Sequence, residues 1–344
     1  MTGSGADGAP MDASWLESEG LLAARDAVVG AEQWQAMSLV GPERVLRTHV
    51  MRGLDLDLVE SRGFDVGAAH FRGVPISWRS PVPDSRALDS PRGLDWVSRF
   101  NGGLVTTCGL HNIGPAKGDE GLHGDFSHRP AQRVAWRTWV EPDEIGVEAV
   151  AVVQDVRLLG PSLTVHRTVT STAVPGGSAG RLRIVDAVEN VGTVPADLAI
   201  LYHVNLGAPL VAPGTRIDTG GTTWRMREPN TLASDPAVMP DVTDVLTEAV
   251  FEHTGLEADP EGYAGVLVRN EAIGLSVRVR WSLGTLPRLY QWILPTRGRW
   301  ALGIEPANAA LFGVDDAGFA ESTDRLEPGD TRTNELIVDV DLVE

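Results

Sequence analysis

The sequence has one cysteine, Cys108, among 344 residues. A lone cysteine excludes an intramolecular disulfide and any zinc site built from cysteine pairs. Residues 1–14 also lack the basic and apolar segments of a secretory signal. Both absences favour a reducing compartment, so we expect a cytoplasmic protein.

Positive charge is scarce, and long apolar runs are missing. The chain carries 29 Lys and Arg residues against 47 Asp and Glu residues, which gives a formal net charge of −18. Nucleic acids and anionic membranes bind through clustered positive charge, so neither is an expected partner. No apolar stretch reaches the roughly 18 residues that a membrane-spanning helix needs. A neutral or polar small molecule is the easier partner for such a chain.

Several common catalytic signatures are absent as well. The sequence contains no GxxxxGKS/T phosphate loop, no GxGxxG after a strand, no HExxH and no GxSxG. The glycine-rich segment 102–114 has no following lysine and opens no helix, so we interpret its glycines as turn residues. Nucleotide binding and HExxH-type metalloprotease chemistry are therefore not indicated.

Aromatic residues are unevenly distributed, with 10 tryptophans and three tyrosines. Tryptophan fills cores well, and its flat ring also packs against the C–H face of a sugar. The composition fits a carbohydrate site, although core packing alone explains any single tryptophan.

Most of the chain consists of short segments rich in Val, Ile, Leu, Thr and Trp that alternate apolar and polar residues. Gly, Pro, Asp and Asn separate these segments, a pattern typical of antiparallel strands. No comparable series of amphipathic helices occurs. We therefore expect an all-β fold, a large antiparallel β-sandwich of two packed sheets. The alternating segments are 54–60, 147–158, 163–170, a hairpin over 181–207, a second hairpin over 265–282, and 335–343.

The segment 1–14 is small, polar and aperiodic, which predicts a disordered tail. A short helix is expected to begin with Ser14 as its N-cap, because the apolar residues Leu16, Leu21, Leu22 and Val28 approximate a helical stripe. No low-complexity linker interrupts the rest, so residues 15–344 are expected to form one domain. A long loop at 226–244 is of the kind that often borders a site.

Three polar clusters carry candidate chemistry: 122-LHG-124, 202-YHVNLG-207 and 303-GIEPAN-308. Any one histidine here is most simply a structural hydrogen-bonding residue. Glu305, however, follows an apolar strand, and a buried carboxylate must be paired or used. Two histidines and a glutamate could hold a metal, but they lack the close local spacing of such sites, so we expect no metal. Acid and base roles suit the same residue types.

These motifs, in this order, resemble the galactose mutarotase (aldose 1-epimerase) superfamily, in particular its poorly characterised bacterial branch. Segments 52–78 and 100–110 add to the resemblance, which extends from about residue 40 onward. The resemblance implies a galactose mutarotase-like supersandwich.

The same resemblance implies roles for three residues. Glu305 would be the base that takes the proton from the anomeric hydroxyl of a free monosaccharide. His203 would be the acid that protonates the ring oxygen, and His123 would hold or polarise that oxygen. Ring opening, rotation about C1–C2 and reclosure then exchange the anomers, and no cofactor is required. The residues expected to bind sugar hydroxyls are Asn205, Arg62, Arg79 and Gln291.

Two other functions fit the same residues. One is a non-catalytic carbohydrate-binding protein on the same scaffold, because a fold does not fix a function. The other is a lyase or isomerase acting on a sugar acid or keto-sugar, whose negative charge Arg62, Arg79 or Arg129 would bind. His128 is interpreted as a structural histidine. The joint presence of His123, His203 and Glu305 favours the epimerase.

Overall fold

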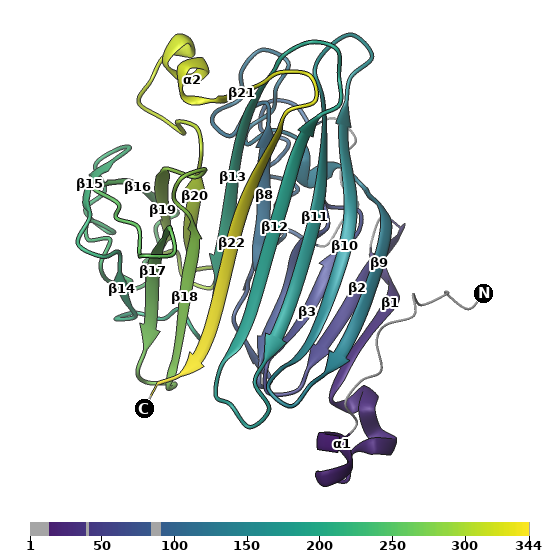
Figure 1. Ribbon diagram of the computed structural model, residues 1–344. Coiled ribbons are helices and arrows are strands. Elements are labelled where there is room, and N and C mark those ends of the chain that lie inside the picture. Colours follow the sequence, from purple (N-terminus) through teal and green to yellow (C-terminus); the bar gives the residue numbers. More distant parts are fainter. Residues whose placement is uncertain (1–13, 39–40, 84–90, 344) are drawn as a thin grey trace.

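Two large antiparallel sheets stack face to face in the computed structural model, which describes residues 14–38, 41–83 and 91–343 (Figure 1). The predicted all-β sandwich is confirmed. Every second residue along the strands points to the inside. These inward residues are mostly apolar, and those of the two sheets pack against each other to form one extended core, as expected for stacked sheets. No helix within these described ranges has the length and apolar character needed to span a membrane.

The first sheet has 12 strands and carries the candidate site. Two short strands pair outside its main path, β5 (Val74–Pro75) with β4 and β21 (Asp324–Leu326) with β13. The main path runs in the order β1 (Val29–Ser38), β2 (Gly41–Val50), β3 (Leu54–Val59), β4 (Asp65–Phe71), β8 (Val105–Leu110), β13 (Ala196–Leu206), β20 (Ala301–Ala307), β19 (Arg288–Leu294), β16 (Ala249–Thr254) and β15 (Thr223–Met226).

The second sheet has eight strands, and a separate two-stranded sheet joins β6 (Trp78–Arg79) to β7 (Gly102–Gly103). In Figure 1 the long strands of the eight-stranded sheet lie side by side across the front of the molecule. Their order is β14 (Arg216–Asp218), β17 (Tyr263–Asn270), β18 (Leu275–Ser282), β22 (Thr331–Leu342), β12 (Gly180–Asn190), β11 (Ser162–Ala173), β10 (Ile145–Val156) and β9 (Ala131–Val140).

One predicted hairpin is confirmed and the other is wrong. Strands β17 and β18 pair directly, with Asn270 opposite Leu275, as expected for 265–282. The two strands of 181–207 do not pair: β12 lies in the eight-stranded sheet and β13 in the 12-stranded sheet. The connection between them therefore crosses from one sheet to the other. Strand alternation cannot distinguish such a crossing from a hairpin, because both need a turn between two amphipathic strands.

Helical structure is short. The helix expected from Ser14 is present as α1 (Ser14–Ser18) and a 3₁₀ segment, η1 (Leu22–Ala27), which are separated by Gly20 at φ 69°. The expected disordered tail lies outside the described residues, except for Ser14. Two further helical segments are η2 (Phe126–His128) and α2 (Asp316–Ser322).

Strand β13 is buried on both faces, so a polar side chain on either face is removed from water. Ile200, Tyr202 and Val204 point into the core between the sheets. The alternate residues Ala199 and Leu201 point to the outer face, where a second apolar cluster covers the sheet. Because side chains alternate along a strand, His203 shares this outer face.

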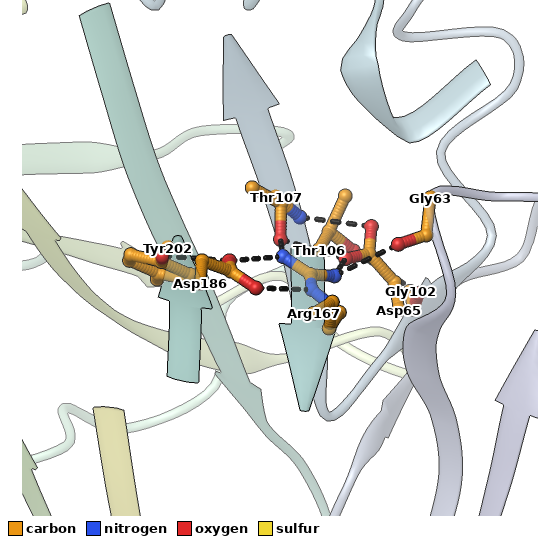
Figure 2. Close-up of polar contacts among 8 residues, drawn as sticks. All are labelled: Gly63, Asp65, Gly102, Thr106, Thr107, Arg167, Asp186 and Tyr202. Atoms are coloured by element: carbon orange, nitrogen blue, oxygen red, sulfur yellow. Dashed lines mark hydrogen bonds and ion pairs between the residues drawn. The ribbon is translucent and has the colours of Figure 1, made fainter. Parts of the chain in front are cut away.

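A buried arginine joins the two sheets behind that strand (Figure 2). Arg167 on β11 donates to both carboxylate oxygens of Asp186 on β12, at 2.8 and 2.6 Å. It also donates to Asp65 on β4 at 2.6 Å and to the hydroxyl of Thr107 on β8 at 2.8 Å. The hydroxyl of Tyr202 on β13 donates to Asp186 at 2.7 Å. Four strands thus meet at one guanidinium group, and β13 joins the network through Asp186.

Replacing Arg167 with Met should destabilise the protein strongly. The change leaves the carboxylates of Asp65 and Asp186 buried without their cation, and breaking a buried pair in this way costs about 3–5 kcal/mol. The free energy of unfolding in urea measures the loss.

A matched control is Arg183→Met on β12, which removes an exposed pair with Glu335. Exposed pairs contribute about 0–1 kcal/mol, so the control should lose little. Equal losses for the two variants would contradict the role given to Arg167.

Candidate active site

His203 and Glu305 meet on the outer face of the 12-stranded sheet. Their strands β13 and β20 are paired, with Val204 opposite Ile304. The Nε2 atom of His203 lies 3.3 Å from Oε1 of Glu305, and both side chains are almost fully buried. Gly303 makes room for this pair, because a Cβ atom there would lie 2.8 Å from Glu305 Oε1 and 3.0 Å from His203 Cε1.

His123 reaches the same place from the loop that follows β8. It adopts a left-handed backbone with φ 59°, and the next residue, Gly124, has φ 72°. A Cβ atom on Gly124 would lie 2.4 Å from the carbonyl oxygen of Gly109, so only glycine fits there. Backbone hydrogen bonds from Gly109 to His123 and from Asp125 to Gly109 fasten this loop to the end of β8.

The hydrogen bonding of His123 determines what its ring can do. Its Nδ1 lies 2.6 Å from the carbonyl oxygen of Ile113. A carbonyl only accepts, so Nδ1 must carry the hydrogen, and in the neutral ring Nε2 is an acceptor. Burial lowers the pKa of His123, which keeps the ring neutral at pH 7. The ring is therefore suited to accept a hydrogen bond from a ligand hydroxyl.

One cavity of about 430 Å³ is lined by His123, His203 and Glu305 together. This volume falls within the range of small-molecule sites. Aromatic rings surround His203, with centroid distances of 5.4 Å to Phe100, 5.5 Å to Trp292 and 6.3 Å to Trp96. The cavity combines a polar group of three residues with a largely aromatic wall.

The buried pair has an unusual protonation state. Burial raises the pKa of Glu305 to about 8, with a smaller contribution from the nearby carboxylate of Glu248 and an opposing effect of Arg227. Burial also lowers the pKa of His203 to about 3, with a smaller contribution from His123. At pH 7 the pair therefore carries a single proton, which resides mainly on Glu305. Nδ1 of His203 and Oε1 of Glu305 have no hydrogen-bond partner within the described part of the chain, so the 3.3 Å contact of the pair is a close approach and not a formed hydrogen bond.

An ion pair that the sequence did not reveal lies in the same cavity. Arg227 Nη2 is 2.6 Å from Glu248 Oε1, and the indole nitrogen of Trp292 donates to Glu248 Oε2 at 2.9 Å. Arg227 lies within the long loop predicted at 226–244 to border a site, and Glu248 follows that loop by four residues. The loop was a usable signal, but neither residue belongs to a recognisable motif.

Two of the expected hydroxyl-binding residues do not line the cavity. Gln291 on β19 shares the core-facing side of its strand with Leu289 and Ile293, and its side-chain amide bonds to His253 and Pro236. Asn205 lies on the same face as His203 but is fully buried, and its amide nitrogen donates to the carbonyl oxygen of His203. Strand alternation excludes Gln291 from the site, whereas Asn205 supports His203 from within the sheet.

The two expected arginines line a different cavity. Arg62 and Arg79, together with His128, border a space of about 180 Å³. Trp78, Trp96 and Phe100 line both this space and the larger cavity, so the two are neighbours.

Arg129 and His128, which the sequence analysis also considered, both lie outside the larger cavity. Arg129 binds the carboxylates of Asp125 and Asp155 at 2.5 and 3.0 Å and does not line the larger cavity. His128 is buried, and burial together with the nearby Arg62 lowers its pKa to about 4. Across the described ranges, no group of three or more His, Cys, Asp or Glu side chains is arranged to hold a metal ion.

The raised pKa of Glu305 should make stability depend on pH. The folded state holds this proton up to about pH 8, whereas the unfolded chain releases it near the ordinary value of 4.5. Folding therefore binds a proton between these values, and the stabilising contribution, fully present below pH 4.5, is lost as pH rises toward 8. The free energy of unfolding of the parent, minus that of Glu305→Gln, should fall by up to about 1.4 kcal/mol per pH unit across this window.

Urea unfolding of both proteins at pH 5, 6, 7 and 8 measures this difference. A difference that stays constant with pH would show that Glu305 ionises at its ordinary pKa.

The fold has clear relatives among solved structures. A candidate aldose 1-epimerase from Klebsiella pneumoniae has a TM-score of 0.75 at 22% identity, and the match covers 92% of this chain and 84% of that chain. A galactose mutarotase-like protein from Clostridium acetobutylicum has a TM-score of 0.59 at 13% identity, covering 92% and 100%. The GalM/aldose epimerase homologue from C. elegans has a TM-score of 0.52 at 15% identity, also covering 92% and 100%.

These identities are low, so the likeness shows the fold and confirms the predicted galactose mutarotase-like supersandwich. No curated protein is significantly similar to the sequence. A family model described as a domain of unknown function, DUF4432, matches residues 42–340. Because this match spans most of its length, the chain belongs to the DUF4432 family.

Proposed function

We propose that the protein is an aldose 1-epimerase that interconverts the anomers of a free monosaccharide. The observation that carries the proposal is the 3.3 Å approach of His203 Nε2 to Glu305 Oε1 at the wall of a cavity that His123 also lines. Anomer exchange needs one proton removed from the anomeric hydroxyl and one delivered to the ring oxygen. These two oxygens are bonded to the same carbon, so an acid and a base this close can serve both.

In the proposed reaction, Glu305 as carboxylate takes the proton from the anomeric hydroxyl while His203 as imidazolium protonates the ring oxygen. The bond between C1 and the ring oxygen breaks, and C1 becomes a carbonyl carbon. Rotation about C1–C2 presents the other face of the carbonyl, and reversal of both proton transfers closes the ring. No net proton is gained or lost.

The protonation state of the pair is consistent with this scheme. A carboxylic acid beside a neutral imidazole holds the same single proton as a carboxylate beside an imidazolium. Transfer of that proton from Glu305 to His203 across 3.3 Å converts the resting form to the reactive one. As long as the pair holds one titratable proton, between about pH 3 and pH 8, one of its two members can donate a proton and the other can accept one.

The remaining polar groups of the cavity are assigned to substrate binding. Nε2 of His123 accepts from a sugar hydroxyl, which differs from the contact with the ring oxygen that the resemblance implied. Arg227 and Glu248 supply donors and an acceptor for neighbouring hydroxyls. The proposal places the sugar between this ion pair and the two histidines.

The alternatives receive less support from the same geometry. For a sugar acid, the arginines expected to bind its charge, Arg62, Arg79 and Arg129, do not line this cavity; of the two arginines that do, Arg227 is paired with Glu248 and Arg299 is the remaining cation. A purely binding protein would have no use for a buried carboxyl whose pKa is raised to about 8.

Removing either member of the pair should abolish most of the activity. Glu305→Gln keeps the shape of the side chain but removes the base, and His203→Asn removes the acid. Each should lower kcat by about 10²–10⁴-fold, and the double variant should lose less than the product because the two act as a unit. His123→Ala should cost less than either. Anomer exchange measured by NMR or polarimetry over a panel of sugars provides the rates.

Exchange by Glu305→Gln within about threefold of the parent on its best sugar would rule out the base assignment. Sugar binding with no measurable exchange in the parent would favour the binding protein instead.

The pH profile should report the single proton of the pair. Above about pH 8 the pair loses it and retains a base without an acid, so kcat/KM should fall there. Between about pH 5 and 7 kcat/KM should be flat, because the pair gains a second proton only near pH 3. A value of kcat/KM that rises from pH 7 to 9 would mean that an ionised Glu305 alone limits the rate.

Turnover should also survive exhaustive chelation, because proton transfer to and from a hemiacetal needs no Lewis acid. Rates before and after dialysis against a chelator test this. Activity that is lost on chelation and restored by a divalent ion would indicate a metal-dependent isomerase.

A further inference from the structure

The proposed chemistry needs one particular tautomer of His203. In the function proposed above, the resting pair is a carboxylic acid beside a neutral imidazole, and the proton of Glu305 passes to Nε2 of His203 across 3.3 Å. A ring nitrogen that accepts a proton carries none of its own, so the hydrogen of the neutral ring must lie on Nδ1. The group that accepts from Nδ1 therefore decides whether His203 can act.

Nδ1 of His203 is enclosed by protein. Only 4% of the residue is exposed, and Nδ1 has no hydrogen-bond partner among residues 14–38, 41–83 and 91–343. A buried N–H group without an acceptor is costly. The tautomer of a histidine is set by the hydrogen bond that its other nitrogen makes. An acceptor for Nδ1 must accordingly come from a neighbouring side chain.

Asn205 carries the complementary atom. It lies two residues after His203 on β13, so both side chains point to the same outer face of the sheet. Asn205 is fully buried, and its Oδ1 also lacks a hydrogen-bond partner in the part of the chain that the structure describes. An amide oxygen only accepts, and the N–H group of the required tautomer only donates. The two unpartnered atoms are chemically matched.

The ring of His203 leans toward Asn205 along the strand. Gly303 on β20 is the register partner of Asn205, and side-chain positions paired in this way are about 4.5–5.5 Å apart. A Cβ atom at position 303 would lie 3.0 Å from Cε1 of His203, and Cε1 is bonded to Nδ1. The imidazole therefore reaches past its own position toward the pair formed by Asn205 and Gly303.

A hydrogen bond fixes which way the amide of Asn205 faces. Its Nδ2 donates to the carbonyl oxygen of His203 at 2.9 Å. A carbonyl only accepts, so exchanging Oδ1 with Nδ2 would lose this bond and bring two acceptors together. Oδ1 is thus the amide atom that remains available to the ring.

We propose that Asn205 is a positioning residue that accepts a hydrogen bond from Nδ1 of His203 and so leaves Nε2 without a hydrogen, facing Glu305. The catalytic consequence rests on the function proposed above, whereas the tautomer does not. His123 has the same tautomer through a different acceptor, the carbonyl oxygen of Ile113. Both histidines of the site then offer an unprotonated Nε2.

NMR of the parent protein tests the tautomer directly. Long-range ¹H–¹⁵N correlations at pH 7, on protein labelled with ¹⁵N in its histidines, show which ring nitrogen carries the hydrogen. The His203→Asn variant identifies the signals of His203 by their loss. We expect the hydrogen on Nδ1 and none on Nε2. A hydrogen on Nε2 and none on Nδ1 would overturn the proposal without recourse to any variant at position 205.

Two substitutions separate the acceptor from the packing. Asn205→Leu removes the acceptor at similar volume and should move hydrogen from Nδ1 to Nε2 of His203. It should lower kcat by about 10–10³-fold with little change in KM, since a catalytic histidine in the wrong tautomer can lose up to about 10⁴-fold. Asn205→Asp retains an acceptor, so it should keep the hydrogen on Nδ1 and have a kcat at least about tenfold above that of Asn205→Leu.

Two controls distinguish positioning from general loss of packing. His123 is an internal control in the same spectra, because Ile113 and not Asn205 accepts its hydrogen. Asn190→Leu is the matched variant: Asn190 is equally buried, and its amide nitrogen donates to two backbone carbonyl oxygens elsewhere. Neither the tautomer of His123 in Asn205→Leu nor that of His203 in Asn190→Leu should change. An equal change of His203 in both leucine variants would overturn the proposal.

The two readouts separate this inference from the proposed function. Hydrogen on Nδ1 of His203 in a parent that does not exchange anomers would support the positioning role and overturn the epimerase. Exchange by a parent whose His203 carries hydrogen only on Nε2 would overturn the positioning role and leave the epimerase standing. An Asn205→Leu variant with the tautomer and the kcat of the parent would likewise overturn the positioning role.

Discussion

The ion pair network around Arg167 is the interaction on which the rest of the structure depends. One buried guanidinium group holds Asp65 of the 12-stranded sheet and Asp186 of the eight-stranded sheet, so the two sheets are fixed relative to each other at this point. Thr107 and Tyr202, which complete the network, are register partners on β8 and β13. The next pair in the same register is Thr106 with His203. At this level of β8 and β13, the residues that face the core belong to the hydrogen-bonded Arg167 network. The neighbouring residue His203 faces outward and belongs to the candidate site.

Burial explains the chemistry of that site as directly as it explains the fold. His203 and Glu305 lie on a strand pair that is covered on both faces, so neither side chain can be hydrated as a charged group without cost. The pair responds by sharing one proton. The rings of Trp96, Phe100 and Trp292 surround His203 and contribute to this burial.

The sequence predicted most of this arrangement where strand alternation or a motif carried it. The all-β sandwich, the 265–282 hairpin and the three clusters around His123, His203 and Glu305 were accessible in this way. Alternation along β19 could also have excluded Gln291, because its neighbours Tyr290 and Trp292 point outward. Contacts between distant segments were not accessible: nothing local reveals that Arg227 meets Glu248, or that β12 and β13 belong to different sheets. Such features arise only when the strands are assembled.

The most direct test of the central claim is a crystal structure of the Glu305→Gln variant with a reducing monosaccharide bound. The account predicts one sugar ring in the cavity, with its ring oxygen within hydrogen-bond distance of His203 Nε2, its anomeric hydroxyl at the side chain of position 305 and one hydroxyl at Nε2 of His123. A sugar bound elsewhere, or one in this cavity whose anomeric carbon lies away from positions 203 and 305, would contradict it.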